Sequence, residues 1–256
     1  MPKIAVTGKG GVGKTSFASL MAYVLTERGQ KVYAIDADPN ATLAHALGFP
    51  PALAVQVTPI VEMDDLIEER TGARPGEYGR MFKLNPRVDD IPERFSVEHR
   101  GVHLLQMGTV RGAGAGCVCP ENAVLRTLVT YLLLREKETV ILDMVAGLEH
   151  LGRGTARAVD AMFTIVEPGT RSIDTAKRIA SLARDLRVES LWVVANKVRR
   201  PSDEAFIREH LDGLPLVGTL PFSERAIEAD MESRALYDAA PELAERTRQI
   251  LDAVLS

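Results

Sequence analysis

The stretch Gly8-Lys9-Gly10-Gly11-Val12-Gly13-Lys14-Thr15 decides the fold of this chain. It follows an apolar run, Ile4-Ala5-Val6, which is typical of a buried strand, and it precedes apolar residues at helical spacing. A strand, a glycine-rich turn and a helix in this order predict a phosphate-binding loop. The glycines let backbone N–H groups turn toward phosphate oxygens, and the start of the helix adds a partial positive charge. We therefore expect nucleotide phosphates to bind from Gly8 through Ser16.

Two side chains of this loop have predicted roles of their own. Lys14 is expected to reach the outer phosphates as a catalytic cation, and the Thr15 hydroxyl is expected to ligate Mg²⁺. The structural alternative is a glycine-rich turn with an incidental lysine. The complete motif, placed between a strand and a helix, favours the phosphate loop.

Length and composition are those of a globular protein. The chain has 256 residues, of which 46% are hydrophobic and 26% charged, so we expect a single domain over residues 1–256. The net charge of −4 provides no basic field for nucleic acid or anionic lipid. Met1-Pro2-Lys3 lead directly into the first strand, and no apolar run approaches the ~20 residues of a membrane span. Two cysteines do not make a secreted disulfide framework. We expect a cytoplasmic protein with no nucleic-acid or membrane partner.

Strands alternate with helices along the chain, which predicts an α/β fold with a doubly wound, mostly parallel sheet flanked by helices. After the first strand, the expected strands are 32–35, 102–107, 139–142, 161–166, 191–195 and 216–220. The expected helices are 15–28, 42–47, 63–70, one that carries residues 124–132, 172–186 and an amphipathic tail over 242–255. The mixed charge of the tail favours packing on the sheet over membrane binding. Residues 50–100 are expected to be an irregular insertion near the nucleotide, either facing a partner or solvated.

Three aspartates follow buried strands. Asp36 and Asp38 come after the strand 32–35, and Asp143 comes after the strand 139–142. Because α/β sheets bind ligands at the carboxyl ends of their strands, we expect Asp38 to position and polarise the attacking water, with Asp36 near the Mg²⁺ shell. Asp143 is interpreted as a Walker B aspartate that holds Mg²⁺ through water. Alternatively, Asp36 and Asp38 cap the following helix and Asp143 is structural.

Two other strand ends are weaker candidates for contacts with the base. Asn196-Lys197 ends one strand, where the Asn196 amide could read a base. Pro221-Phe222 ends the next strand and could flank an adenine. Without the phosphate loop, each of these segments would be interpreted as a plain loop.

Lys9, the second lysine of the loop, extends the motif. In the form Gly-Lys-Gly-Gly-x-Gly-Lys-Thr the loop resembles the deviant Walker A motif of the MinD, ParA and nitrogenase iron protein ATPases. In that class the early lysine crosses a dimer interface and touches the partner's nucleotide. The resemblance therefore implies an ATP-dependent homodimer with a catalytic role for Lys9. The plain alternative is a solvated surface lysine.

Cys117 and Cys119 are one residue apart and precede Pro120-Glu121, a pair suited to the first turn of a helix. A disulfide across so short a spacing would be strained, whereas a helix N-terminus lowers the pKa of a thiol and favours the thiolate that binds soft metals. One chain offers two such ligands and structural zinc sites usually have four, so a twofold axis near this loop would complete the site. The spacing alone favours two buried small residues, and the context of a dimerising ATPase reverses that preference.

Four blocks together resemble the accessory ATPases that insert nickel into carbon monoxide dehydrogenase (CooC-type). They are the phosphate loop, Asp-Ala-Asp-Pro-Asn at 36–40, Cys-Val-Cys-Pro-Glu-Asn at 117–122, and residues 143–154. The resemblance spans nearly the whole chain. It implies a homodimer, formed on nucleotide or metal binding, that holds nickel or zinc at Cys117 and Cys119 and uses ATP in maturing the apo-carbon monoxide dehydrogenase. One departure is Val145, where an acidic residue is expected.

Two other functions compete with this interpretation. A positioning or partition ATPase like MinD or ParA acts on membrane or DNA, and the acidic balance and mixed-charge tail argue against it. An iron–sulfur reductase like the nitrogenase iron protein also shares a cluster across a dimer, but the cysteines of that class lie far apart in sequence.

Overall fold

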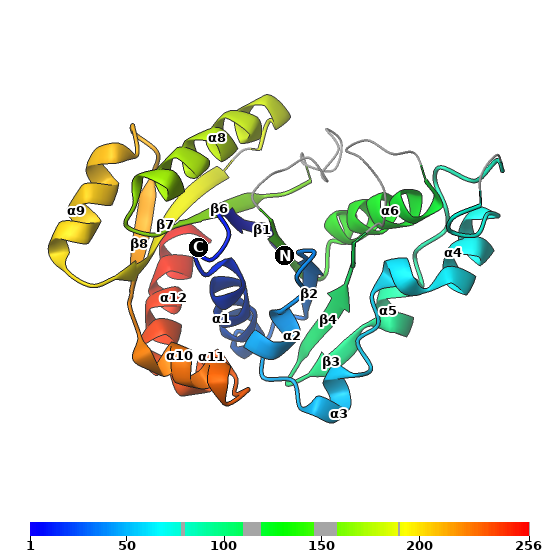
Figure 1. The fold of residues 1–256 in the computed structure, drawn as a ribbon, viewed down its shortest axis with the longest axis horizontal. Coiled ribbons are helices and arrows are strands. Elements are labelled where there is room, and N and C mark those ends of the chain that lie inside the picture. The colour runs from blue at the N-terminus through cyan, green and yellow to red at the C-terminus, as the bar shows by residue number, and fades with distance from the viewer. Residues whose placement is uncertain (78–79, 110–118, 146–157, 189, 256) are drawn as a thin grey trace.

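The computed structural model describes residues 1–77, 80–109, 119–145, 158–188 and 190–255. Its central feature is an eight-stranded sheet in the order β3-β4-β2-β5-β1-β6-β7-β8 (Figure 1). All neighbouring strands are parallel except β3 and β4. The strands are β1 (Lys3–Gly8), β2 (Val32–Ala37), β3 (Val97–His99), β4 (Val102–Gln106), β5 (Thr139–Met144), β6 (Ala161–Val166), β7 (Ser190–Val198) and β8 (Leu216–Pro221). The predicted doubly wound, mostly parallel fold is confirmed.

Helices lie on both faces of this sheet. They are α1 (Lys14–Glu27), α2 (Leu43–Ala46), α3 (Pro51–Ala54), α4 (Asp64–Thr71), α5 (Ile91–Phe95), α6 (Pro120–Leu134), α8 (Thr170–Leu186), α9 (Pro201–His210), α10 (Glu224–Met231), α11 (Leu236–Ala239) and α12 (Pro241–Val254), with a 3₁₀ turn at Ile60–Glu62. The long ones agree with the sequence prediction to within a few residues. The sequence analysis did not predict α9, α10 and α11.

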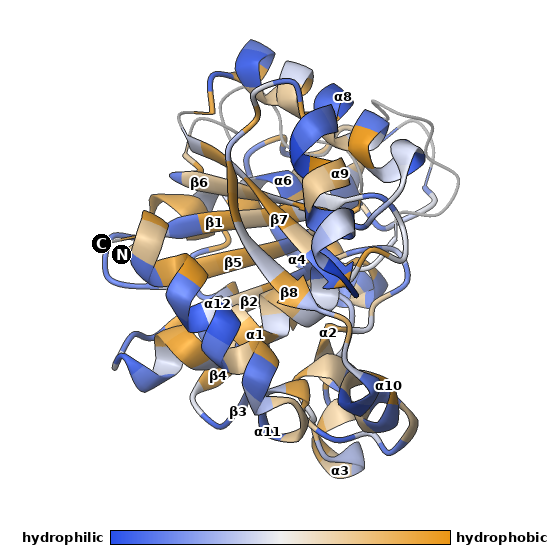
Figure 2. Ribbon diagram, turned by 90° about the vertical axis from the view of Figure 1, so that its left-hand side faces the viewer, coloured by the Kyte–Doolittle hydropathy of each residue, from blue (hydrophilic) through white to orange (hydrophobic). Residues whose placement is uncertain are grey.

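The alternation of side chains along the strands sorts the core into layers. On β1, Ile4 and Val6 join a buried cluster formed with α1, α11 and α12, whereas Ala5 joins a cluster formed with α4, α6 and α8. Every residue of β1, β5 and β6 is buried, and Figure 2 shows β1 and β5 coloured as hydrophobic strands. Both faces of the central strands are thus covered, as parallel sheets require.

Residues 50–100 contain more regular structure than the predicted irregular insertion. Besides α4, which the sequence predicts, they form α3, α5 and the antiparallel edge strand β3. Ile60, Ile67 and Ile91 are fully buried against the same face of the sheet as α6. Elements of four or five residues carry too little periodicity to be predicted, because such short helices are stable only through tertiary contacts.

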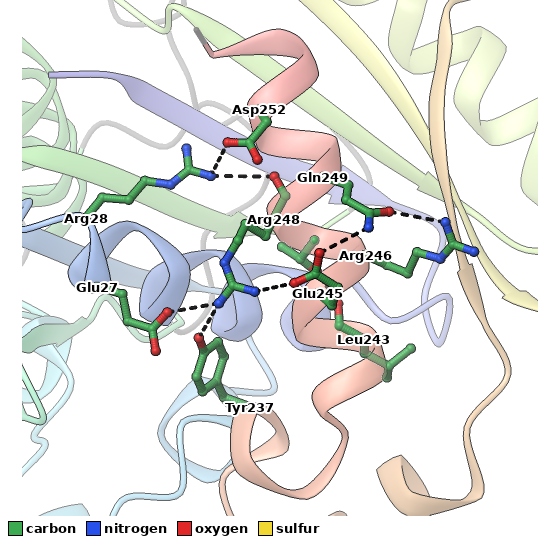
Figure 3. Close-up of polar contacts among 10 residues, drawn as sticks. Glu27, Arg28, Tyr237, Leu243, Glu245, Arg246, Arg248, Gln249 and Asp252 are labelled. Carbon is green, nitrogen blue, oxygen red and sulfur yellow. Dashed lines mark hydrogen bonds and ion pairs between the residues drawn. The ribbon is translucent and has the colours of Figure 1, made fainter.

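The tail helix α12 packs against α1 and β8, as its apolar face predicts. Leu251 is fully buried at this contact. Figure 3 shows the polar border of the contact, where Arg248 of α12 reaches Glu27 of α1 at 3.0 Å and the Tyr237 hydroxyl at 3.0 Å. Arg248 and Glu27 are 37% and 54% exposed, so solvent screens their attraction and apolar burial holds the helix in place.

This contrast gives a stability prediction. Leu251→Ala is expected to lower the free energy of unfolding by about 2–5 kcal/mol, because it leaves a cavity in the core. Arg248→Ala is expected to cost less than about 1 kcal/mol, because its ion pairs are exposed. Chemical denaturation of both variants checks the order, and a larger loss for Arg248→Ala would contradict it.

Candidate functional site

The candidate site lies at the carboxyl edge of the sheet, where the strand order reverses. The chain passes from β1 to β2 on one side of the sheet and later adds β6, β7 and β8 on the other side. In open α/β sheets, ligands bind in the crevice at such a reversal. The loop that leaves β1 at Gly8 and enters α1 at Lys14 therefore stands at the favoured place.

Two glycines of this loop are required by close contacts. A Cβ on Gly8 would lie 2.5 Å from the carbonyl oxygen of Ile165 on the neighbouring strand β6. Gly13 is the N-cap of α1 with φ 95°, in the left-handed region, and a Cβ there would lie 2.2 Å from the amide nitrogen of Asn196. Only a residue without a side chain fits both the backbone conformation and the space.

A bulge at the end of β7 holds this loop from the side. The pairing of β7 with β8 shifts between Ala195 and Val198, and Lys197 has φ 59°. The Asn196 side-chain amide donates to the Val12 carbonyl at 2.8 Å, and the Lys197 ammonium donates to the Gly11 carbonyl at 2.5 Å. These two hydrogen bonds from β7 side chains to loop carbonyls fix the conformation of the loop. Asn196 and Lys197, which the sequence analysis predicts to lie near the base, both contact the loop, and both also line the pocket described below.

Lys14 and Asp38 face each other across the loop. The Lys14 ammonium lies 3.8 Å from a carboxylate oxygen of Asp38, with the side chains only 7% and 15% exposed. The other Asp38 oxygen accepts the backbone N–H of Asn40 at 2.9 Å. The structure therefore brings together a buried cation and a carboxylate that the sequence analysis assigned to phosphate and to water.

Asp36 lies behind Asp38, at the end of β2, and is 2% exposed. Its two oxygens accept backbone N–H groups of Asp38 at 3.2 Å and of Leu43, the first residue of α2, at 2.9 Å. Burial raises the pKa of Asp36, and these two backbone hydrogen bonds oppose that shift. Asp36 thus orders the segment between Asp38 and the first residue of α2. The oxygens of Asp38 contact Asn40 and Lys14 instead of that helix, so the alternative that both aspartates cap it is met by Asp36 alone.

Asp143 ends β5 beside the loop and is fully buried. One of its oxygens accepts the Thr15 hydroxyl at 2.6 Å, and the other, Oδ1, has no hydrogen-bond partner among the described residues. Burial raises its pKa to about 7, although the Thr15 hydroxyl favours the ionised form. An unpartnered buried carboxylate oxygen is costly. Carboxylate and hydroxyl oxygens are ligands that Mg²⁺ prefers, so this donor set fits the predicted ion.

A pocket of about 350 Å³ opens beside the loop. Its lining is mostly apolar and includes Gly13, Ser16, Leu20, Asn196, Pro221 and Phe222. Pro221 and Phe222 thus line a pocket beside the loop, and their expected contact with a base stays a prediction. The Arg199 guanidinium lies 3.6 Å from the centre of the Phe222 ring. An apolar pocket next to a phosphate loop suits a planar base.

The sequence analysis missed the far wall of this pocket, which α2 and α10 supply. Among its lining residues are His45 of α2 and Ile227 of α10. The His45 ring lies 3.2 Å from the Asp230 carboxylate, which connects the two helices. No motif marks these residues, because they come from short helices that only the fold brings to the loop.

Lys9 lies at the tip of the loop, half exposed, and its ammonium is 3.8 Å from a carboxylate oxygen of Glu167. Glu167 is the residue that follows β6. The sequence analysis missed it, although its position after a buried strand is the signal that identified the three aspartates.

The predicted thiolate site is only partly within the described residues. Cys119 is the N-cap of α6, with Pro120 in the first turn, as expected for a thiol at a helix N-terminus. Cys117 lies outside the described residues, as does the block 146–154 after Asp143. Within the described part of the chain, no group of three or more His, Cys, Asp or Glu side chains is arranged to hold a metal ion.

Comparison with known proteins gives three kinds of likeness. Residues 3–236 match the family model of the CobQ/CobB/MinD/ParA nucleotide binding domain. The chain is 47% identical over 253 residues, 99% of its length and 96% of the relative's, to a Rhodospirillum rubrum protein named carbon monoxide dehydrogenase accessory protein CooC. It is 46% identical to an uncharacterized ATP-binding protein of Methanocaldococcus jannaschii, over 89% of this chain and 88% of that one.

Solved structures share the fold at low sequence identity. A ParA family ATPase from Chlorobium tepidum superposes with a TM-score of 0.71 at 13% identity, covering 100% of this chain and 98% of that one. The MinD cell division protein of Aquifex aeolicus superposes with a TM-score of 0.69 at 17% identity, covering 100% of this chain and 97% of that one.

In the part of the chain that the structure describes, no helix combines the length and apolarity needed to cross a bilayer.

The contact between Gly13 and Asn196 gives a test of the loop. Gly13→Ala is expected to lower the free energy of unfolding by about 2–4 kcal/mol, because the left-handed conformation costs about 1–2 kcal/mol and a buried hydrogen bond is displaced. Gly10→Ala is the matched control, since a Cβ on Gly10 meets no atom within 4 Å. Denaturation of the nucleotide-free variants measures both, and equal losses would contradict the steric argument.

Proposed function

The chain belongs to the CobQ/CobB/MinD/ParA family of nucleotide-binding ATPases and is related to the CooC accessory protein, and from this premise we propose a specific role for it. It acts as an Mg-ATP-dependent homodimer that carries nickel or zinc on Cys117 and Cys119. It uses ATP to assist nickel insertion into apo-carbon monoxide dehydrogenase. The 47% identity over 99% of the chain to a protein named for that enzyme carries the proposal.

The loop and the strand ends have distinct roles in ATP hydrolysis. Backbone N–H groups from Gly8 to Ser16 bind the phosphates, and Lys14 neutralises the charge that develops on the outer phosphate. Asp38 positions and polarises the attacking water. The buried ion pair of Lys14 with Asp38 supports this assignment, because it keeps a cation and a carboxylate side by side at the mouth of the loop.

The Mg²⁺ ligands in this proposal are the Thr15 hydroxyl and, through water, Asp143. When bound, the ion supplies a positive charge that stabilises the leaving phosphate oxygens. Asp36 keeps the segment of Asp38 in register through its two backbone hydrogen bonds. The unpartnered Oδ1 of Asp143 is the observation that supports a cation here.

The base binds in the pocket of about 350 Å³. Pro221 and Phe222 flank the ring, and Asn196 and Lys197 stand between the base and the loop. The Asn196 amide keeps hydrogen-bonding capacity beyond its contact with Val12, since an amide has two donors and two acceptor lone pairs.

The number of cysteine ligands determines how nickel or zinc binds in this proposal. A single chain has two cysteines, and thiolate sites for zinc usually have four ligands. Two copies related by a twofold axis supply four thiolates, so in this proposal the site is complete only in the dimer. Lys9 reaches the partner's nucleotide in the same assembly, which connects nucleotide state to metal binding.

The competing role as a membrane-positioning ATPase finds no support in the tail. The apolar residues of α12 are used inside the fold, since Leu243, Ile250 and Leu251 are 4%, 3% and 0% exposed. A membrane-targeting helix needs its apolar face free for lipid.

Substitution of Asp38 tests the hydrolytic assignment. Asp38→Asn is expected to lower kcat by about 10²–10⁴-fold, because an amide cannot accept a proton from the attacking water. ATP binding should persist, since Lys14 loses only a competing partner. Asp252→Asn is the matched control, as Asp252 lies on the surface of α12 and is 63% exposed. Steady-state phosphate release measures both variants, and wild-type kcat in Asp38→Asn would reject the role.

Substitution of the cysteines tests the cargo site. Cys117→Ser and Cys119→Ser are each expected to abolish stoichiometric nickel or zinc in the ATP-bound dimer, because each change removes two of four thiolates. ATP hydrolysis by the variants serves as the control for folding. Metal analysis of the purified dimer gives the stoichiometry. Unchanged stoichiometry would reject the site, and tight metal capture by the wild-type monomer without nucleotide would reject sharing between subunits.

A further inference from the structure

Three adjacent strands bring charged side chains together beside the tip of the phosphate loop. The order β1-β6-β7 places the three carboxyl ends in one row. Gly8 of β1 pairs with Ile165 of β6, and Val166 of β6 pairs with Ala195 of β7. Lys9, Glu167 and Lys197 each lie one or two residues beyond these pairs. The register therefore places a single carboxylate between two lysines.

Glu167 uses both carboxylate oxygens on these lysines. Oε1 lies 3.8 Å from the Lys9 ammonium, and Oε2 lies 3.3 Å from the Lys197 ammonium. The Lys197 ammonium also donates to the Gly11 carbonyl, so it has a second partner in the loop. Lys9 differs, because Glu167 is its one ion-pair partner among the residues that the structure describes.

The backbone of Glu167 is fixed on both sides. Its N–H donates to the Ser172 hydroxyl at 3.1 Å, in the first turn of α8, and Ser172 is 2% exposed. Val166, the preceding residue, is fully buried in β6. Because this backbone is already ordered, only the side-chain torsions of Glu167 have to be fixed when it pairs with Lys9.

We infer that Glu167 is a positioning residue that holds Lys9 on its own subunit and restrains the reach of Lys9 toward a second subunit until phosphates compete for it. The inference rests on the proposed function, because it presumes the nucleotide-dependent dimer. It assigns to Glu167 the regulation of that dimer. It gives Lys9 two alternative partners, the Glu167 carboxylate of its own chain and the phosphates bound to the other chain.

Charge and exposure set the size of the effect. Lys9 and Glu167 are 40% and 28% exposed, so their pair is screened by solvent. A pair of this kind shifts an equilibrium by about 1.4- to 5-fold. Each dimer releases two such pairs, so the effect on the dimer dissociation constant is the square, about 2- to 25-fold. An ion pair of this strength is weak enough for the phosphates of a nucleoside triphosphate to replace it.

Glu167→Gln is the informative variant, because it removes the charge and keeps the shape. Lys197 retains the Gly11 carbonyl in this variant, so the loop keeps its lateral support. The matched control is Glu204→Gln. Glu204 pairs with Arg208 on α9 at 2.8 Å and is 36% exposed. The control therefore removes one charge and one partly exposed ion pair, whereas Glu167→Gln removes one charge and two ion pairs.

The first measurement is independent of dimerisation. Acylation of Lys9 by an amine-reactive reagent, read by mass spectrometry on nucleotide-free monomer, is expected to be about 1.4- to 5-fold faster in Glu167→Gln than in wild type or Glu204→Gln, because Lys9 has lost its partner. Equal rates in all three proteins would overturn the inference.

The second measurement is analytical ultracentrifugation with Mg-ATP over a range of protein concentrations. Glu167→Gln is expected to dimerise with a dissociation constant about 2- to 25-fold below that of wild type, with Glu204→Gln unchanged. If wild type dimerises and Glu167→Gln has the same constant, the regulatory role of Glu167 is rejected and the proposed function stands. If wild type stays monomeric with Mg-ATP at every concentration, the dimeric function is rejected, and the inference with it, whatever the acylation rates.

Discussion

The site depends on the close approach of the Asn196 side-chain amide to the backbone of Gly13. The loop enters α1 through a left-handed residue, and the amide occupies the place where a side chain would stand. The same amide donates to the Val12 carbonyl, which holds this part of the loop against β7. Strand β7, the last but one along the chain, therefore fixes the conformation of the loop after β1. The conformation of the phosphate site thus depends on a strand that is far from the loop in sequence.

Around this loop the protein keeps charges buried that only a ligand would satisfy fully. Lys14 has Asp38 as its ion-pair partner at 3.8 Å, which is long for an ion pair, and Asp143 keeps an unpartnered oxygen in the core. Desolvation makes such groups costly unless they are paired. A phosphate anion and a divalent cation would supply the missing partners together. The arrangement is thus preorganised for a nucleotide with its metal ion. Without the nucleotide, the burial of these groups lowers the free energy of unfolding.

Much of this site could be predicted because its residues follow strands in the sequence. Asp36, Asp38 and Asp143 lie at or just past the carboxyl ends of strands that apolar runs mark clearly, and Lys14 and Thr15 belong to the motif that follows β1. Glu167 also follows a buried strand, but its pairing with Lys9 could not be found in this way, and neither could the lining of the pocket from α10. Their roles come from which strands are neighbours and from a bulge in β7, and neither the strand order nor a bulge leaves a local pattern in the sequence. The same reason explains α3, α5 and β3, which are stable only because buried residues such as Ile60 and Ile91 hold them on the sheet.

The direction of the strands places the thiol and the nucleotide site on one edge. Helix α6 follows β4 in the chain and returns antiparallel to it, so its N-terminal residue, Cys119, lies at the carboxyl edge of the sheet. The phosphate loop leaves β1 at that same edge. A second subunit that approaches this edge closely enough to meet Lys9 therefore also approaches the cysteine-bearing end of α6. In the proposed dimer, a single twofold contact at this edge would complete both sites. That is the simplest way in which a chain with two cysteines would connect the state of its nucleotide to the binding of a metal ion.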